Sequence, residues 1–258
     1  MSRLSFRTRT TILLLAGAAA AWAVSAERMR GMDSGPGTDL GGLGWYLGIW
    51  VTMTVAMMLP SAAPAAGHVA RVTRRVQAST GLFVAGYLAV WTAYGLAAYG
   101  VFRLVSSIDT GALAWDDLGA YVAGAVIVAA GIYELTPLKR RSLRRCRGAR
   151  HPESALRSGV AHGMDCVGSS GGLMLVLFVL GVMSLFWMAL VAVAIFAEKA
   201  VPHGSRLAPV VAAALVALGI WVAVAPASVP GLTQPGSGSP SMEMGSSMSE
   251  PANERSQS

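Results

Sequence analysis

The sequence predicts an all-α protein, a polytopic transmembrane bundle of about six helices. Of its 258 residues, 54% are hydrophobic and only 13% are charged, whereas about a quarter of a soluble domain is charged. The mean hydropathy is +0.55. The apolar residues gather in runs of membrane-spanning length, and the charged residues lie almost wholly between these runs. We therefore expect a lipid bilayer to cover part of the surface.

The first apolar segment, residues 11–26, has two interpretations. The preceding arginines and the Val24-Ser25-Ala26 ending resemble a cleavable signal peptide. A retained first helix fits equally well, and we favour it because it can pack against later helices. The domain organisation is then a first transmembrane helix or signal-like segment (1–26), a helical membrane domain (27–225) and a Pro/Gly/Ser/Met-rich tail (226–258). A tail of this composition cannot bury a core, and we expect it to be disordered.

Five further apolar runs follow, at residues 43–66, 82–105, 118–135, 167–197 and 207–225. The run 167–197 exceeds the length of one upright span. Because no turn-forming residues interrupt 173–197, we expect one long tilted helix with a bend near Gly181.

Two features mark the run that begins at residue 43. Trp45, Tyr46 and Trp50 stand near its start, where an aromatic belt at the membrane surface is expected. Pro60 and Pro64 stand near its end, where they are expected to break or kink the helix.

The net charge of +7 is explained by topology rather than by nucleic-acid binding. Basic residues concentrate before the first run, in the connection 68–75 and in the connection Lys139–Arg150. The positive-inside rule places all three on the cytoplasmic side of a bacterial inner membrane. The acidic connection 109–117 then lies on the other side. We further expect Glu134 to pair with Lys139 or Arg140, and Glu198 with Lys199, at the membrane interface.

Methionine, histidine and cysteine supply the candidate metal ligands. Met57 and Met58 precede the prolines, and thioether sulfur suits Cu(I), although packing is the commoner role of such methionines. His162 and Cys166 are four residues apart, so a helix would place both on one face. Imidazole and thiolate together suit copper or zinc. The alternative is an interfacial histidine beside a buried, inert cysteine.

Three strings in order resemble a bacterial family of predicted metal-binding integral membrane proteins, a domain of unknown function. They are Met57–Pro64 (MMLPSAAP), Leu135–Lys139 (LTPLK) followed by Cys146, and the series His162-Gly163, Cys166, Gly172–Met174, Gly181–Met183, Trp187-Met188 and Glu198-Lys199. The resemblance covers about residues 43–207. It implies a helical membrane protein with a metal site, and Cys146 matches a family cysteine. Ser169 and Ser170 stand where the family pattern has a Cys-Cys pair.

Three functions remain open at this stage. The first is a non-enzymatic membrane protein that binds or delivers a transition metal, with copper favoured, together with a metal-handling or membrane partner. Its candidate ligands are Met57, Met58, His162, Cys166, Met174 and Met183. The second is a small-solute permease, and the third is a structural or assembly partner. Glycines that would suit close helix packing in such a partner are Gly81, Gly86, Gly95, Gly100 and Gly124. No catalytic triad, Walker or Rossmann signature is present, which argues against an enzyme.

Overall fold

The computed structural model describes residues 6–29, 42–73, 76–108, 119–148, 154–181, 184–201 and 207–229. These residues form helices, and no strand occurs among them, so the expected all-α class is confirmed. The helices are α1 (Phe6–Met29), α2 (Leu43–Thr73), α3 (Val76–Ile108), α4 (Ala120–Glu134), α5 (Pro137–Arg147), α6 (Ala155–Gly181), α7 (Leu185–Ala200) and α8 (Ala208–Val224), followed by the 3-10 turn η3 (Pro226–Ser228).

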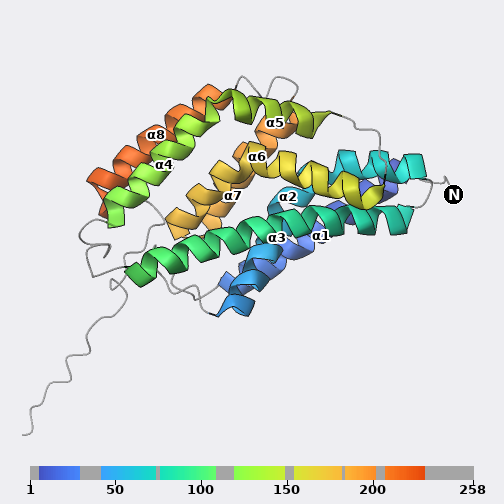
Figure 1. Cartoon of the computed structure of the whole chain (residues 1–258), viewed down its shortest axis with the longest axis horizontal. Helices are drawn as coiled ribbons and strands as arrows, with labels where there is room; N and C mark the ends of the chain where they lie inside the picture. Colours follow the sequence, from blue (N-terminus) through green and yellow to red (C-terminus); the bar gives the residue numbers. More distant parts are fainter. Residues whose placement is uncertain are drawn as a thin grey trace, which may run out of the picture.

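Within the described ranges, four helices, α1, α2, α3 and α6, are long and apolar enough to cross a membrane. The pair α4 and α5, bent by 64°, counts as a fifth if it forms one broken span. In Figure 1, α4 and α8 lie side by side along one edge of the molecule, and α1, α2 and α3 gather along the other. α6 contacts both groups, because it packs on α3 and on α4. It therefore provides the central wall of the bundle.

The prolines of α2 do not break the helix, so the first of the two expected effects is wrong. It continues through Pro60 and Pro64 to Thr73, and the Ser61 hydroxyl donates a 2.8 Å hydrogen bond to the Met58 carbonyl beside the first proline. The residues around the prolines are largely buried against the other helices. Tertiary packing thus outweighs the local cost of proline in a helix.

The expected aromatic belt on α2 is wrong for two of its three residues. Trp45 is exposed, but Tyr46 and Trp50 are buried. Their polar atoms donate 2.9 Å hydrogen bonds to backbone carbonyls of α3, at Gly95 and Trp91 respectively. Both side chains therefore join α2 to α3.

The apolar run 167–197 is two helices rather than one long helix. α6 ends at Gly181, the very position of the expected bend, and α7 begins after Ser184, whose backbone is extended. The side chain of Lys199, at the end of α7, reaches Cys166 in the middle of α6. α7 therefore turns back along the second half of α6.

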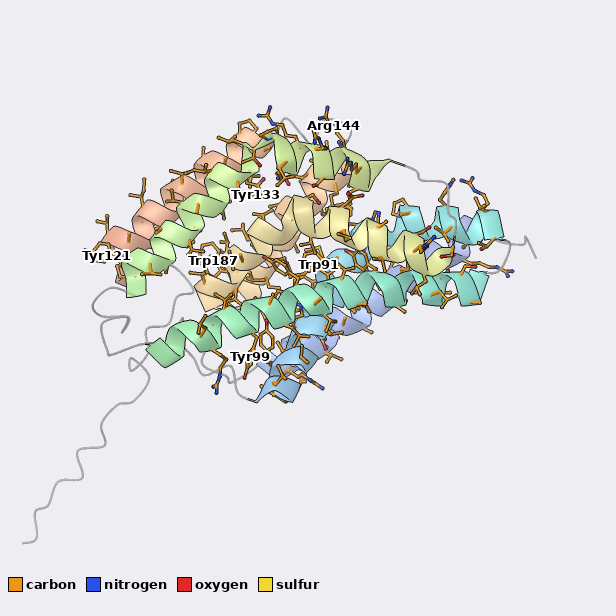
Figure 2. All side chains as sticks on the ribbon, in the orientation of Figure 1. Trp91, Tyr99, Tyr121, Tyr133, Arg144 and Trp187 are labelled. Carbon is orange, nitrogen blue, oxygen red and sulfur yellow. The ribbon has the colours of Figure 1, made fainter. Side chains whose placement is uncertain are left out.

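The basic segment after α4 is also helical, where the sequence suggested a connection. Thr136 caps α5 by accepting a hydrogen bond from the Lys139 amide, and Pro137 occupies the first turn, where proline is tolerated. Lys139, Leu143 and Cys146 are buried on one face of α5. The arginines cover the other face, and Arg144 points outward from the bundle in Figure 2.

Candidate metal centre

The centre begins with the pair on α6 that the sequence singled out. His162 and Cys166 lie one turn apart on a continuous helix, with exposed fractions of 7% and 0%. The imidazole ring lies beside two rings of α3, with centroid distances of 5.7 Å to Phe83 and 5.8 Å to Tyr87. These ring contacts pack the histidine against α3.

Helix α5 adds a second cysteine to this pair. The Sγ atom of Cys146 lies 3.8 Å from Nε2 of His162, and its side chain is buried. The approach of α5 to α6 depends on Gly168, because a Cβ atom there would lie 2.6 Å from the Ser142 hydroxyl. The Tyr133 hydroxyl also donates a 2.6 Å hydrogen bond to the Gly168 carbonyl. The glycine-rich stretch 168–172 is thus helical and serves close packing.

Two further side chains converge on the sulfur of Cys166. The Lys199 ammonium of α7 donates to it across 2.8 Å, and the Tyr87 hydroxyl of α3 lies 2.9 Å away. A neighbouring ammonium group favours the thiolate form of a cysteine, which is the form that binds metals. Three helices besides α6 therefore contribute to one small buried cluster.

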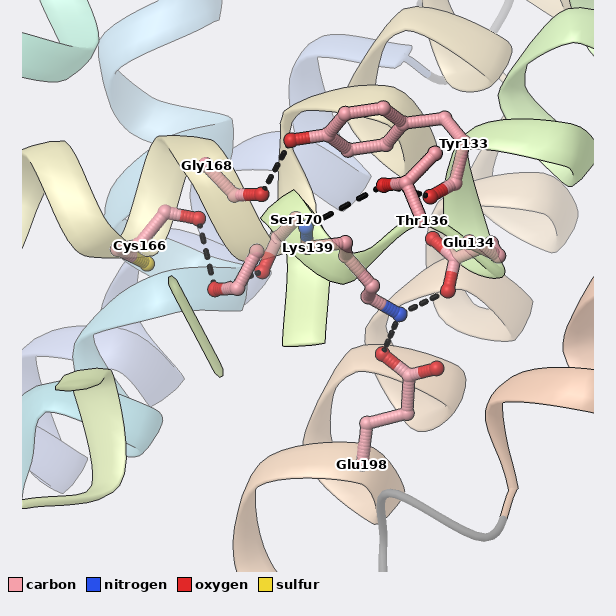
Figure 3. A network of polar contacts seen from close by, with 9 residues as sticks. Tyr133, Glu134, Thr136, Lys139, Cys166, Gly168, Ser170 and Glu198 are labelled. Carbon is pink, nitrogen blue, oxygen red and sulfur yellow. Dashed lines mark hydrogen bonds and ion pairs between the residues drawn. The ribbon is translucent and has the colours of Figure 1, made fainter. Parts of the chain in front are cut away.

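The position of Lys199 corrects the expected ion pair with Glu198. Glu198 instead accepts a 2.6 Å hydrogen bond from Lys139, which also pairs with Glu134 as expected. All three side chains are buried rather than interfacial. Figure 3 shows the Lys139 ammonium between the two carboxylates, joining α4, α5 and α7.

Burial lowers the pKa of Lys139, and the attraction of Glu198 acts in the opposite direction. Breaking such a buried pair leaves an uncompensated charge and typically costs about 3–5 kcal/mol. Loss of any one of the three side chains should therefore destabilise the junction that carries Cys146 and Lys199. The hydrogen bond of Lys199 goes to Cys166 instead.

The donor chemistry suits a soft metal ion. Interaction with the Cys166 thiol and burial together raise the pKa of Cys146, so this thiol must give up a proton when it binds a metal. In the part of the chain that the structure describes, no three His, Cys, Asp or Glu side chains stand close enough to hold a metal ion. The donor types, two sulfurs and one imidazole nitrogen, are nevertheless those that Cu(I) prefers, so copper binding would draw the three side chains together.

The methionine candidates lie elsewhere in the same buried core. Met57, Met58 and Met174 are all buried there, and the core cluster also includes Cys146 and Cys166. Ser169 and Ser170 stand at the positions of the family Cys-Cys pair. The Ser169 hydroxyl donates to the Cys166 carbonyl and also contacts the Ser170 hydroxyl. Met183, the acidic connection 109–117 and the tail from residue 230 lie outside the described residues.

Sequence reasoning missed the roles of Tyr87 and Lys199, and it assigned Cys146 no place among the candidate ligands. Cys146 is one of only two cysteines in the chain, and the resemblance had marked its position. No local pattern indicates Tyr87 or Lys199, because their contacts with Cys166 join residues 79 and 33 positions apart.

Comparison with known proteins agrees with this chemistry. Residues 47–222 match the model of a family named PpoB2 and described as copper chaperone. No curated protein and no solved structure matches the chain significantly. The family match covers more than half of the chain and includes every residue of the cluster, from Tyr87 to Lys199. The chain belongs to the PpoB2 copper chaperone family, which confirms the expectation of a metal-handling family.

Proposed function

We propose that this protein is a non-enzymatic, membrane-embedded copper handler that binds Cu(I) through Cys146, His162 and Cys166. The observation that carries the proposal is the 3.8 Å approach of the Cys146 sulfur to the His162 nitrogen, one helical turn from Cys166. Soft sulfur ligands from two helices favour Cu(I) over harder cations. A site made at a helix–helix contact also suits a metal that must later be passed on.

The membrane location is supported by the surface of the bundle. Large apolar side chains are exposed on α4, α7 and α8, among them Ile132, Phe186, Val193, Val210 and Ile220. Lipid contact is the simplest reason for so many exposed apolar residues on apolar helices. We propose a bacterial inner membrane, with the N-terminus and the Lys139–Arg150 segment in the cytoplasm, because the basic residues gather there.

The methionines are proposed as thioether ligands for copper deeper in the bundle. Met58 and Met174 are fully buried in the core that also contains both cysteines. A neutral thioether ligand holds Cu(I) without adding negative charge to an apolar interior. Met57 and Met183 complete this proposed set.

The test is the copper content of protein purified anaerobically in a nonionic detergent. We expect about one Cu(I) per chain in the wild type, and loss of most of it in a Cys146→Ser, Cys166→Ser double variant and in a His162→Ala, Cys166→Ser variant. Serine preserves the size of the side chain but removes the soft ligand. Met164→Leu is the matched control, because it removes a soft ligand from the exposed face of α6.

Unchanged copper content in both double variants would refute this site. A wild-type protein that takes up no copper would refute the function itself. Leucine variants of Met57, Met58 and Met174, read in the same assay, examine the thioether ligands with little change in side-chain volume.

A further inference from the structure

A surface pocket of about 690 Å³ lies against the candidate metal centre. It is lined by α1, α2, α6, α7 and the end of α5, and both Cys146 and His162 contribute to its wall. Pro60 and Pro64 of α2 also line it. Cys146 and His162 are buried, whereas Arg71 and Arg147 are exposed, so the pocket connects the surface with the cluster.

The polar part of the pocket is positively charged. Arg71, Arg147 and Lys199 line it together with His68, and its described lining contains no Asp or Glu. Arg71 is held beside His68 by a 3.3 Å hydrogen bond, and Arg147 donates to the carbonyls of Lys199 and Val201. Such a lining raises the local concentration of anions and repels a bare copper cation.

The pocket is also far larger than a metal ion requires. Its volume lies within the range of about 300–1,000 Å³ that is usual for small-molecule sites. A cationic pocket of this size, with a cysteine in its buried wall, suits a small organic anion that carries copper on sulfur.

We propose that the pocket receives copper as an anionic Cu(I) complex of a low-molecular-weight thiol that bears carboxylates. The inference rests on the proposed copper function and adds the form in which copper arrives. The carboxylates of the carrier pair with Arg71 and its neighbour His68, and the bound Cu(I) faces Cys146. Arginine suits this role because its guanidinium group binds carboxylates through paired hydrogen bonds.

The transfer is a ligand exchange without a redox step. A bond forms between Cu(I) and the sulfur of Cys146, and the bond between Cu(I) and the carrier sulfur breaks. The proton of the Cys146 thiol leaves with the released carrier thiolate, which becomes a thiol. Copper stays in the +1 state throughout.

The experiment compares two copper donors on the full chain in nonionic detergent. One donor is the anionic Cu(I)–glutathione complex, and the other is Cu(I) solvated by acetonitrile, which is a cation. We expect Arg71→Glu to slow loading from the glutathione complex about tenfold, as loss of electrostatic steering does, and not to slow loading from the acetonitrile complex. Arg71→Gln should give an intermediate rate.

The matched control is Arg144→Glu, which makes the same charge change on an exposed arginine of α5 outside the pocket. It should load from both donors as the wild type does. The pocket assignment would be overturned if Arg71→Glu and Arg144→Glu slowed copper loading equally, or if Arg71→Glu slowed loading from both donors equally. Copper binding itself would stand in either case. A wild-type chain that accepts copper from neither donor would overturn the copper function as well.

Discussion

Cys166 is the residue on which the most interactions of the centre converge. Its sulfur faces the Lys199 ammonium and the Tyr87 hydroxyl, which lie 2.8 and 2.9 Å away. A copper ion held by two thiolates carries a net negative charge. Lys199 supplies the nearest compensating positive charge, so we assign it as a positioning residue for the proposed site.

Replacing Lys199 tests this role at the scale of one residue. We expect Lys199→Met to weaken Cu(I) binding about tenfold or more, since a hydrogen bond to a charged group contributes about 1.5–3 kcal/mol. The measurement is competition for Cu(I) against a chromogenic chelator. Lys199→Arg retains the charge and should restore most of the affinity, whereas a purely structural role for the lysine stem would leave both variants equally tight.

The spacing of His162 and Cys166 could be read from the sequence, because a helical turn alone aligns them. The partners of this pair could not be read in the same way. Cys146 lies 16 residues before His162, and helix α5 brings its sulfur close to the imidazole. We expected a connection in place of α5 because the segment contains many arginines. Two features of the segment are typical of a helix: the Thr136-Pro137 start, and the spacing of the buried residues Lys139, Leu143 and Cys146. The high charge of the segment hid both features.

At the scale of elements, the close contact of α3 with α6 determines where His162 sits. A Cβ atom at Gly159 would collide with the Phe83 carbonyl of α3, and one at Gly86 would lie 2.5 Å from the Leu156 carbonyl of α6. Small residues at both positions let the two backbones approach, as in membrane helix pairs. This contact brings Phe83 and Tyr87 against the histidine ring.

Gly159→Ala should therefore damage both stability and binding. We expect a loss of about 1–3 kcal/mol from the forced separation of the helices, seen as a lower unfolding temperature by tryptophan fluorescence, and weaker Cu(I) binding. Gly100→Ala on α3 is the matched control, because a Cβ atom there meets nothing within 4 Å. Equal unfolding temperatures for the two variants would show that the contact is looser than described.

Not every glycine with a predicted packing role has one. Gly86, Gly95 and Gly124 each face a neighbouring helix at close range, whereas Gly81 and Gly100 have no atom within reach of an added Cβ. The sequence identifies glycine on a helix, but only the tertiary arrangement determines which face meets a partner. The same limit explains why Tyr46 and Trp50 were assigned to the membrane surface and instead are buried.

At the scale of the whole molecule, the proposed centre is an assembly of four helices. α6 supplies His162 and Cys166, α5 supplies Cys146, α3 supplies Tyr87 and α7 supplies Lys199. The all-α class followed directly from composition and apolar runs. The hairpin of α6 and α7 could not be predicted in this way, because few turn-forming residues follow Gly181. This hairpin brings Lys199 back to Cys166.

X-ray absorption spectroscopy of the copper-loaded protein tests the central claim most directly, because it reports the atoms bound to the metal. The account predicts Cu(I) bound by sulfur together with one imidazole nitrogen, with fewer sulfur ligands in Cys146→Ser and no imidazole signal in His162→Ala. A wild-type spectrum dominated by oxygen ligands, or one that neither substitution alters, would contradict it.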